Sequence, residues 1–193
     1  MARIKWRGST LLSPVPAALV TVGTEERANV LTVAWCGIVC SQPPVTYISV
    51  RPERYSYGLL CEGGEFVIHL TNEALVRATD YCGVYTGAKV DKFEKCGLTK
   101  IPSTEVAPPT IAEAPLALEC RVRRREPLGT HDMFLADIVA VTVREELLDE
   151  AGRLCLERAG LVAYSHGTYY ALGRELGRFG FAAAKRKKPK KGS

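Results

Sequence analysis

The sequence predicts a mostly β protein, built as a barrel with a few short helices rather than as a doubly wound α/β sheet. Strand-length apolar segments are numerous, helical segments are few, and the two kinds do not alternate as they do in β-α-β folds. No predicted strand is followed by a G-x-G-x-x-G dinucleotide fingerprint, and no internal repeat is present. A chain of 193 residues suits a single domain, placed here at residues 1–183, and folding at this size should bury about 70% of the surface of the unfolded chain.

The N-terminal half predicts three strands and one short helix. Strands are expected over residues 17–23, 29–39 and 45–50, and a helix over residues 55–61. The second strand is apolar on both parities from Val30 to Val39, so one face is expected to meet the barrel interior and the other a partner, a helix or a cofactor. Pro52 and Glu53 suit a first helical turn, where a missing N–H is harmless and negative charge is favourable.

The remainder of the chain, from residue 66 onward, predicts a second helix and five further strands. The expected elements are a strand over residues 66–70, a helix over 73–82 capped by Thr71 or Asn72, a helical turn around 91–93, an extended crossing over 99–115, and strands over 116–123, 133–143, 161–163 and 169–172. From Leu116 onward apolar and polar residues alternate, which is typical of a half-buried strand. Glu119 and Arg121 belong to the polar face of this pattern.

The positive charge of the chain is concentrated at its C-terminal end. Formal net charge is +5, and six Lys and Arg residues between positions 185 and 191 contribute +6, which leaves −1 for the rest. We predict that residues 184–193 form a basic, disordered tail, because such a run cannot bury a core. Its attraction to nucleic acid or anionic lipid would be non-specific, so neither a specific nucleic acid partner nor a membrane is expected.

The seven cysteines do not form a disulfide or zinc pattern. Their number is odd, they lack close pairs and no C-x-x-C is present, so we expect mostly buried thiols in a reducing compartment. The apolar stretch from Leu11 to Val20 is interrupted by Pro14 and Pro16, which does not fit a signal peptide, and no apolar run reaches membrane-spanning length. The chain is therefore predicted to be cytoplasmic.

One stretch carries groups that suit a phosphorylated planar ligand. The predicted helix start offers free backbone N–H groups, the hydroxyl of Ser56 and the guanidinium of Arg54, which together suit a phosphate. Asn29 and Trp35 have the same parity on the predicted strand, so both can project from one face. Asn supplies a donor and an acceptor and Trp a flat apolar surface, so a polar ring with a phosphate tail would be served by both halves.

Short segments in a fixed order carry a family resemblance. They are NVLTVAW (29–35), SVRPERYS (49–56), EFVIHL (65–70), TGAKVDKF (86–93), GTHD (129–132), and Tyr164 ahead of GTYYALG (167–173). This set extends over about residues 13–181 and resembles the flavin reductase-like, FMN-binding split-barrel family, most closely its flavoredoxin-type branch. The resemblance implies a Greek-key-like split β-barrel, a homodimer, and FMN held near the subunit interface. The family pattern usually has Ser where Thr86 stands and often Thr where Ser56 stands, and both changes keep a hydroxyl.

The resemblance also implies roles for individual residues. Lys92 would supply a cation for the FMN phosphate together with Arg54 and Ser56; without the resemblance it would be interpreted as an exposed lysine paired with Asp91. His131 would be a flavin neighbour whose N–H could bond the ring or the ribityl chain, in place of a turn histidine that is hydrogen-bonded locally.

Three further kinds of contact are implied. Trp35 and Tyr164 would pack against or beside the isoalloxazine ring, whereas aromatic residues in apolar strands are ordinarily core residues. Asn29, at the head of a buried strand, needs partners that a flavin edge could supply, and Thr32 could add backbone or hydroxyl contacts. The other two histidines lack metal-ligand spacing and are interpreted as structural, no metal is expected, and no catalytic residue is assigned.

The leading hypothesis is an FMN-dependent oxidoreductase that passes electrons from NAD(P)H or a carrier protein through FMN to a flavin, ferric or protein acceptor. Such a reaction requires positioned rings and excluded water rather than an acid–base dyad. No Ser–His–Asp arrangement or pair of carboxylates supports hydrolysis. Two alternatives remain: a non-enzymatic electron-transfer flavoprotein with no NAD(P)H activity of its own, and a split-barrel binding module without FMN whose basic tail recruits nucleic acid.

Overall fold

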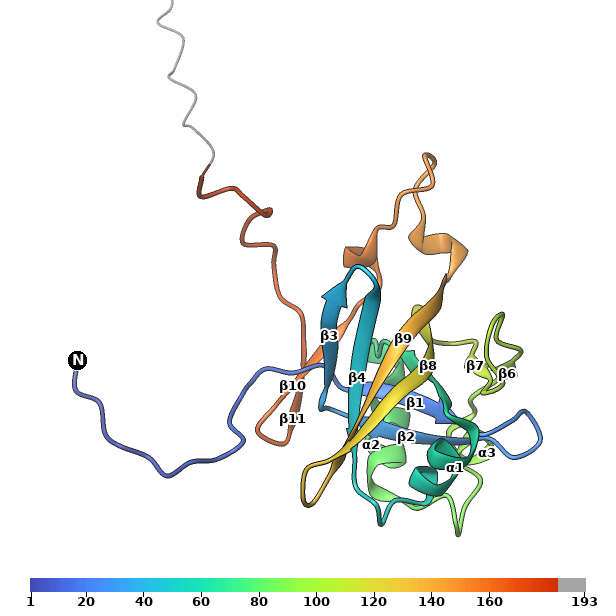
Figure 1. Ribbon diagram of the computed structural model, residues 1–193. Helices are drawn as coiled ribbons and strands as arrows, with labels where there is room; N and C mark the ends of the chain where they lie inside the picture. The colour runs from blue at the N-terminus through green and yellow to red at the C-terminus, as the bar shows by residue number, and fades with distance from the viewer. Residues whose placement is uncertain (184–193) are drawn as a thin grey trace, which may run out of the picture.

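The computed structural model describes residues 1–183 and contains a seven-stranded antiparallel sheet of order β2-β1-β5-β8-β9-β4-β3 (Figure 1). Its strands are β1 (Ala18–Val22), β2 (Asn29–Val33), β3 (Cys36–Ser41), β4 (Pro44–Val50), β5 (Glu65–His69), β8 (Leu116–Pro127) and β9 (Asp132–Val143). The other elements are α1 (Tyr55–Gly63), α2 (Val76–Val84), α3 (Lys92–Cys96), β6 (Lys100–Ile101), β7 (Thr110–Ile111), β10 (Val162–Ser165), β11 (Thr168–Ala171) and the 3₁₀ turns Glu73–Leu75, Glu145–Leu147 and Leu156–Arg158. The prediction of a mostly β chain with few short helices is confirmed.

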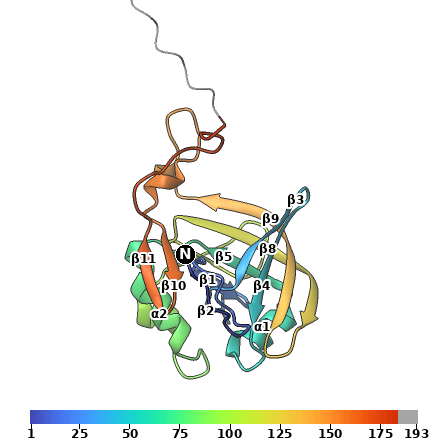
Figure 2. The same cartoon turned by 90° about the vertical axis from the view of Figure 1, so that its left-hand side faces the viewer.

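The sheet curls until its two edge strands approach each other. β2 and β3 lie at opposite ends of the strand order, yet only Ala34 and Trp35 separate them along the chain. Three Cα steps span at most about 11 Å, so the two edges must come close together. At this seam the N–H of Ser49 on β4 donates to the carbonyl of Trp35 at 2.9 Å. Figure 2 shows the strands curving around a common interior.

The single strand predicted over residues 29–39 is therefore wrong, because the chain bends at Ala34-Trp35 and starts a new strand. β2 is largely buried, whereas Ile38 and Val39 on β3 are 63% and 56% exposed. The apolar residues on both parities predicted that both faces of this segment would be buried. In the structure both faces of β2 are largely buried, whereas β3 is mostly exposed.

Two hydrophobic clusters lie on opposite faces of β1 and β2. The barrel interior contains Phe66 and Phe134, both almost completely buried, together with Val20 of β1. The outer cluster joins Leu19 of β1 and Val30 of β2 to residues of α2 and α3. This outer layer holds the segment between α2 and α3 beside β2, at the seam of the barrel.

Some of the helix ends follow local sequence signals, although α2 continues through Gly83 to Val84, beyond the predicted end at residue 82. Asn72 caps the turn before α2 by accepting a hydrogen bond from the backbone N–H three residues later, and α1 ends at Gly64 in the left-handed conformation. However, α1 begins at Tyr55, so Pro52 and Glu53 lie in the turn before the helix. The prediction that they form its first turn is wrong.

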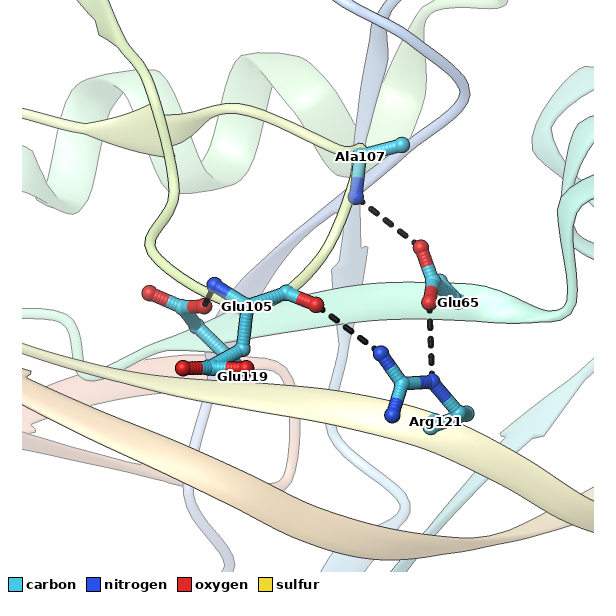
Figure 3. A network of polar contacts seen from close by, with 5 residues as sticks. All are labelled: Glu65, Glu105, Ala107, Glu119 and Arg121. Carbon is cyan, nitrogen blue, oxygen red and sulfur yellow. Dashed lines mark hydrogen bonds and ion pairs between the residues drawn. The ribbon is translucent and has the colours of Figure 1, made fainter.

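Glu119 on β8 is fully buried rather than part of a solvent-facing polar row. Its carboxylate accepts hydrogen bonds from the N–H and hydroxyl of Thr104 and from the N–H of Glu105, at 2.7–3.1 Å. Beside it, Arg121 donates to Glu65 at 3.0 Å and to the carbonyl of Glu105 at 2.9 Å (Figure 3). The long loop between β6 and β7 is thereby fixed over this face of the sheet.

The Glu119→Gln variant is expected to lose about 2 kcal/mol of unfolding free energy, because an amide NH₂ cannot accept from the N–H groups that the carboxylate now satisfies. Urea denaturation measures the loss. Glu25→Gln, at an exposed position in the β1–β2 loop, is the matched control and should change stability by less than about 0.5 kcal/mol. Equal stability of Glu119→Gln and the unmodified protein would contradict the role given to this carboxylate.

The N-terminal segment lies apart from the barrel, and the last ten residues lie outside the part of the chain that the structure describes. Residues 1–13 are exposed and extend away from the body (Figure 1). The basic tail predicted over residues 184–193 lies outside the described residues. Within residues 1–183, none of the helices has the length and apolar character needed to cross a bilayer.

Candidate functional site

A cavity of about 510 Å³ lies at the N-terminal end of α1, where β2 and the segment between α2 and α3 meet. Five of the predicted site residues line it: Asn29, Thr32, Arg54, Ser56 and Lys92. They come from β2, from the start of α1 and from the first position of α3, so separate elements converge here as the sequence predicted. The volume lies within the range of about 300–1,000 Å³ that is usual for small-molecule sites.

A buried polar pair forms one wall of this cavity. The Nδ2 of Asn29 donates to the hydroxyl of Ser56 at 2.6 Å, and both side chains are buried. Gly87 packs against the same amide so closely that a Cβ at this position would lie 2.2 Å from Oδ1 of Asn29. Only glycine leaves room for the Asn29 side chain, so Gly87 shapes the cavity.

The ammonium of Lys92 is buried in the same wall. It donates to the carbonyls of Val30 at 2.9 Å and Cys82 at 2.8 Å, which leaves one of its three N–H groups free of these bonds. Burial lowers the pKa of Lys92, and the charge of Arg54 adds to the effect. The alternative of an exposed lysine is wrong, because Lys92 is only 4% exposed.

The charges around the cavity are mainly positive. Arg51, Arg54 and Lys92 contribute three positive charges, and Glu53 contributes one negative charge. Arg54 is held in place by a hydrogen bond from its guanidinium to the carbonyl of Gly83 at 3.0 Å. In the first turn of α1 the N–H of Tyr57 donates to the carbonyl of Arg54 at 2.9 Å, while those of Tyr55 and Ser56 precede the first intrahelical bonds, so this end of the helix also favours anions.

A smaller cavity of about 180 Å³ adjoins the first and contains Trp35 and His131. Their ring centroids are 4.6 Å apart at an interplanar angle of 43°. Thr32 and Arg54 line both cavities, so the two cavities lie side by side. Trp35 is 41% exposed, which excludes the alternative of a core residue.

His131 lies in a positive local field. Burial lowers its pKa, and the nearby guanidiniums of Arg51 and Arg54 lower it further, while Glu53 acts in the opposite direction. The imidazole is therefore neutral at pH 7, and its Nδ1 lies 3.0 Å from the hydroxyl of Thr130.

Replacing Arg51 by Gln is expected to raise the pKa of His131, because one repelling positive charge is removed. An NMR titration of the imidazole Cε1–H signal measures the change. Glu53→Gln is the matched control of opposite sign and should lower the same pKa. Shifts of equal sign in the two variants would contradict the electrostatic cause.

Tyr164 does not line either cavity. It lies on β10, where its ring packs against Tyr169 at 5.1 Å between centroids and its backbone pairs with Val15. Thr32 does line both cavities, but its hydroxyl donates to the carbonyl of Thr79 and is not free. The cofactor roles predicted for these two residues stay predictions.

Several cavity residues were not singled out from the sequence. Arg51 lines both cavities, and Tyr85 and Cys82 line the larger one. Gly87 belongs to the TGAKVDKF segment, but nothing local shows that it contacts Asn29, because the two positions are distant in the chain. For the residues described, no group of three or more His, Cys, Asp or Glu side chains is placed to hold a metal ion.

The curled antiparallel sheet and its short helices define a split β-barrel, with a polar, positively charged cavity at its seam. The family model described as "Flavin reductase like domain" matches residues 11–173, and the chain belongs to this family. The resemblance stated from the ordered segments and the split-barrel fold are thus confirmed. Membership supports a flavin-related oxidoreductase function.

Two solved structures illustrate the likeness. Flavoredoxin of Desulfovibrio vulgaris (Miyazaki F) has a TM-score of 0.85 and 32% identity, with 95% of this chain and 100% of that chain covered. The FMN-binding protein from Thermus thermophilus with bound 1-cyclohex-2-enone has a TM-score of 0.78 and 27% identity, with 92% and 99% covered. An uncharacterized protein of Archaeoglobus fulgidus is 34% identical over 131 residues, covering 68% of this chain and 73% of its own length.

Proposed function

We propose that this protein is an FMN-dependent oxidoreductase of the flavin reductase type. Electrons would pass from NAD(P)H or a carrier protein to a flavin, ferric or protein acceptor. The observation that carries the proposal is the convergence of the Asn29–Ser56 pair and the Lys92 ammonium in one cavity beside the Trp35–His131 ring pair. The flavoredoxin and FMN-binding protein among the similar structures add support.

The larger cavity fits a phosphate. Arg51, Arg54 and Lys92 outnumber the single carboxylate of Glu53, and a phosphate monoester carries about −1.5 to −2 charge at pH 7. The first N–H groups of α1 and the hydroxyl of Ser56 add donors that need no charge. Arg54 and the α1 N-terminus would hold the phosphate, while Lys92 also fixes β2 and α2 around it.

The smaller cavity fits one edge of a flat ring. When bound, FMN supplies the capacity to accept a hydride and to release its electrons to an acceptor. Trp35 and His131 would orient the ring and shield it from water, and the neutral imidazole would supply a hydrogen-bonding nitrogen without adding charge. Asn29 would position the polar groups between ring and phosphate.

The Arg54→Gln variant is expected to bind FMN about tenfold more weakly, because a charge-assisted hydrogen bond to phosphate is lost. Riboflavin, which lacks the phosphate, should bind both proteins equally. Flavin fluorescence quenching measures both affinities. Arg27→Gln, which removes an exposed ion pair with Glu62, is the matched control. An equal loss for FMN and riboflavin would contradict the placement of the phosphate beside Arg54.

The electron donor distinguishes the enzyme from a non-enzymatic electron-transfer flavoprotein. Anaerobic mixing of the FMN-loaded protein with NADH and with NADPH should bleach the flavin absorbance near 450 nm. A protein that binds FMN but is bleached by neither nicotinamide, and only by a reduced carrier protein or dithionite, would be the electron-transfer flavoprotein.

A homodimer is part of the proposal. Ile38 and Val39 on β3, and Trp6, Leu11 and Leu12 in the N-terminal segment, are exposed apolar side chains that a second copy would cover. Tyr164 would reach a cofactor only if such a dimer brings the β10–β11 hairpin of one subunit to the cavity of the other. Sedimentation equilibrium with and without FMN tests the assembly, and cytoplasmic location stays a prediction.

A further inference from the structure

Two cysteines face each other at the ends of two helices. Cys82 lies in the last turn of α2 and Cys96 is the final residue of α3, and their Sγ atoms are 4.0 Å apart in a sulfur–sulfur contact. A disulfide requires about 2.0 Å, so rotation of the two side chains and a small approach of α3 would close the bond. The odd number of cysteines and their sequence spacing gave no indication of this pair.

Of the two cysteines, Cys96 is the one that solvent can reach. Cys82 is buried in the outer hydrophobic cluster, whereas Cys96 is partly exposed and lines an open groove of about 820 Å³. The charged residues lining the groove are Arg77, Lys95, Arg144 and Glu113. Because the three positive charges outnumber the single negative charge of Glu113, the groove is positive overall and suits a small anionic reagent.

We propose that Cys82 and Cys96 form a reversible disulfide through exchange with a low-molecular-weight anionic disulfide that enters this groove. The thiolate of Cys96 attacks one sulfur of the reagent, forms a mixed disulfide and releases one reagent thiolate. The thiolate of Cys82 then attacks the Cys96 sulfur and releases the second reagent thiolate. The two protein thiols lose two electrons and two protons, and the reagent disulfide gains them as two thiols.

Cys96 is the attacking residue for two reasons. It is the partly exposed member of the pair, and although burial raises the pKa of its thiol, its hydrogen bond with Cys82 and the charge of Lys92 act in the opposite direction. Burial raises the pKa of Cys82 to about 12, so Cys82 does not compete with Cys96 for the reagent. Its sulfur lies 4.0 Å from that of Cys96, and this proximity favours its attack on the mixed disulfide in the second step.

The disulfide would cross-link the two ends of the chain segment that borders the larger cavity. Residues 82–96 include Tyr85, Thr86, Gly87 and Lys92, all of which line it. Cross-linking the two ends of this segment restricts its motion. The disulfide itself does not depend on the proposed FMN function; only its effect on cofactor exchange does.

The test is incubation of the purified full chain with glutathione disulfide, followed by alkylation of free thiols and peptide mapping by mass spectrometry. We expect the loss of two of the seven thiols, a linked peptide pair containing Cys82 and Cys96, and full recovery with dithiothreitol. Hydrogen exchange of residues 85–91 should slow in the oxidised protein. The assay needs no flavin, so failure to bind FMN and failure to form the disulfide are separate outcomes.

Variants make the outcome decisive. Cys96→Ser should form no linked peptide, and Cys40→Ser, which removes an exposed thiol elsewhere, should form it as the unmodified protein does. Glutathione attached only to Cys40, Cys61 or Cys96, with no linked pair, would overturn the proposal. Unchanged exchange of residues 85–91 in a protein with the mapped disulfide would overturn the restriction of the cavity segment.

Discussion

Replacing Gly87 by alanine is expected to lower the affinity for FMN by about 100-fold or more, through the loss of a buried hydrogen bond and overpacking of the cavity wall. The alanine Cβ would lie 2.2 Å from Oδ1 and 2.6 Å from Cγ of Asn29, which is well inside van der Waals contact. Asn29 cannot yield without breaking its bond to Ser56. The displaced amide would enter the space given to the cofactor. Isothermal titration with FMN measures the loss.

Two variants separate this effect from general damage. Gly83→Ala places a Cβ 3.4 Å from Cβ of Thr32, an ordinary contact, and should bind FMN as the unmodified protein does. In the Gly87→Ala background, Asn29→Ala removes the clashing atoms and should restore part of the affinity. Wild-type affinity in Gly87→Ala alone, with an unchanged circular dichroism spectrum, would contradict the importance of this contact.

The fold was predictable where the signal is local. The strand expected over residues 45–50 is β4, and that expected over residues 133–143 is β9, within one residue at either end. The break at Ala34-Trp35 was not predictable, because apolar character on both parities reports burial and not chain direction. The burial of Glu119 was missed for a related reason: the loop that covers it returns from a distant part of the sequence.

The candidate site was predictable to the extent that it follows the family segments. The local sequence selected Asn29 and Ser56, the resemblance added Lys92, and the fold brings the three into one cavity. The carbonyl bonds of Lys92 and the contact of Gly87 with Asn29 depend on how α2, α3 and β2 pack, and no local pattern encodes them. Because the buried Lys92 joins two backbone segments, its removal should reduce stability as well as phosphate binding, whereas the exposed Arg54 makes one bond to the carbonyl of Gly83 and its removal should reduce stability less.

His69 is a structural histidine whose burial should make stability depend on pH. Its Nε2 accepts the N–H of Ile111 at 2.9 Å, so the proton is on Nδ1, which donates to the carbonyl of Leu19 at 3.1 Å. Burial lowers its pKa from 6.5 to about 4. A charged imidazole would repel the Ile111 N–H in a fully buried site, so the folded chain keeps His69 neutral.

The direction in which stability changes with pH follows from proton binding. Between about pH 6.5 and 4 the unfolded chain binds a proton at His69 that the folded chain does not, so stability falls as pH falls through this window. The contribution is complete above pH 6.5, and its loss by pH 4 amounts to about 3 kcal/mol at 1.36 kcal/mol per unit of pKa. Urea unfolding at pH 7 and pH 4.5 should show most of this decrease.

The carboxylates titrate in the same pH range as His69. The effect of His69 is separated from theirs by comparing how steeply the unfolding free energy falls with pH in different variants. Gln can accept from Ile111 and donate to Leu19 without titrating, so His69→Gln should show a shallower decrease in unfolding free energy between pH 7 and 4.5. His166→Gln, in the exposed β10–β11 turn, should keep the slope of the unmodified protein. Identical slopes in all three proteins would mean that His69 takes up its proton in the folded state, and the hydrogen bond assigned to Ile111 would then be wrong.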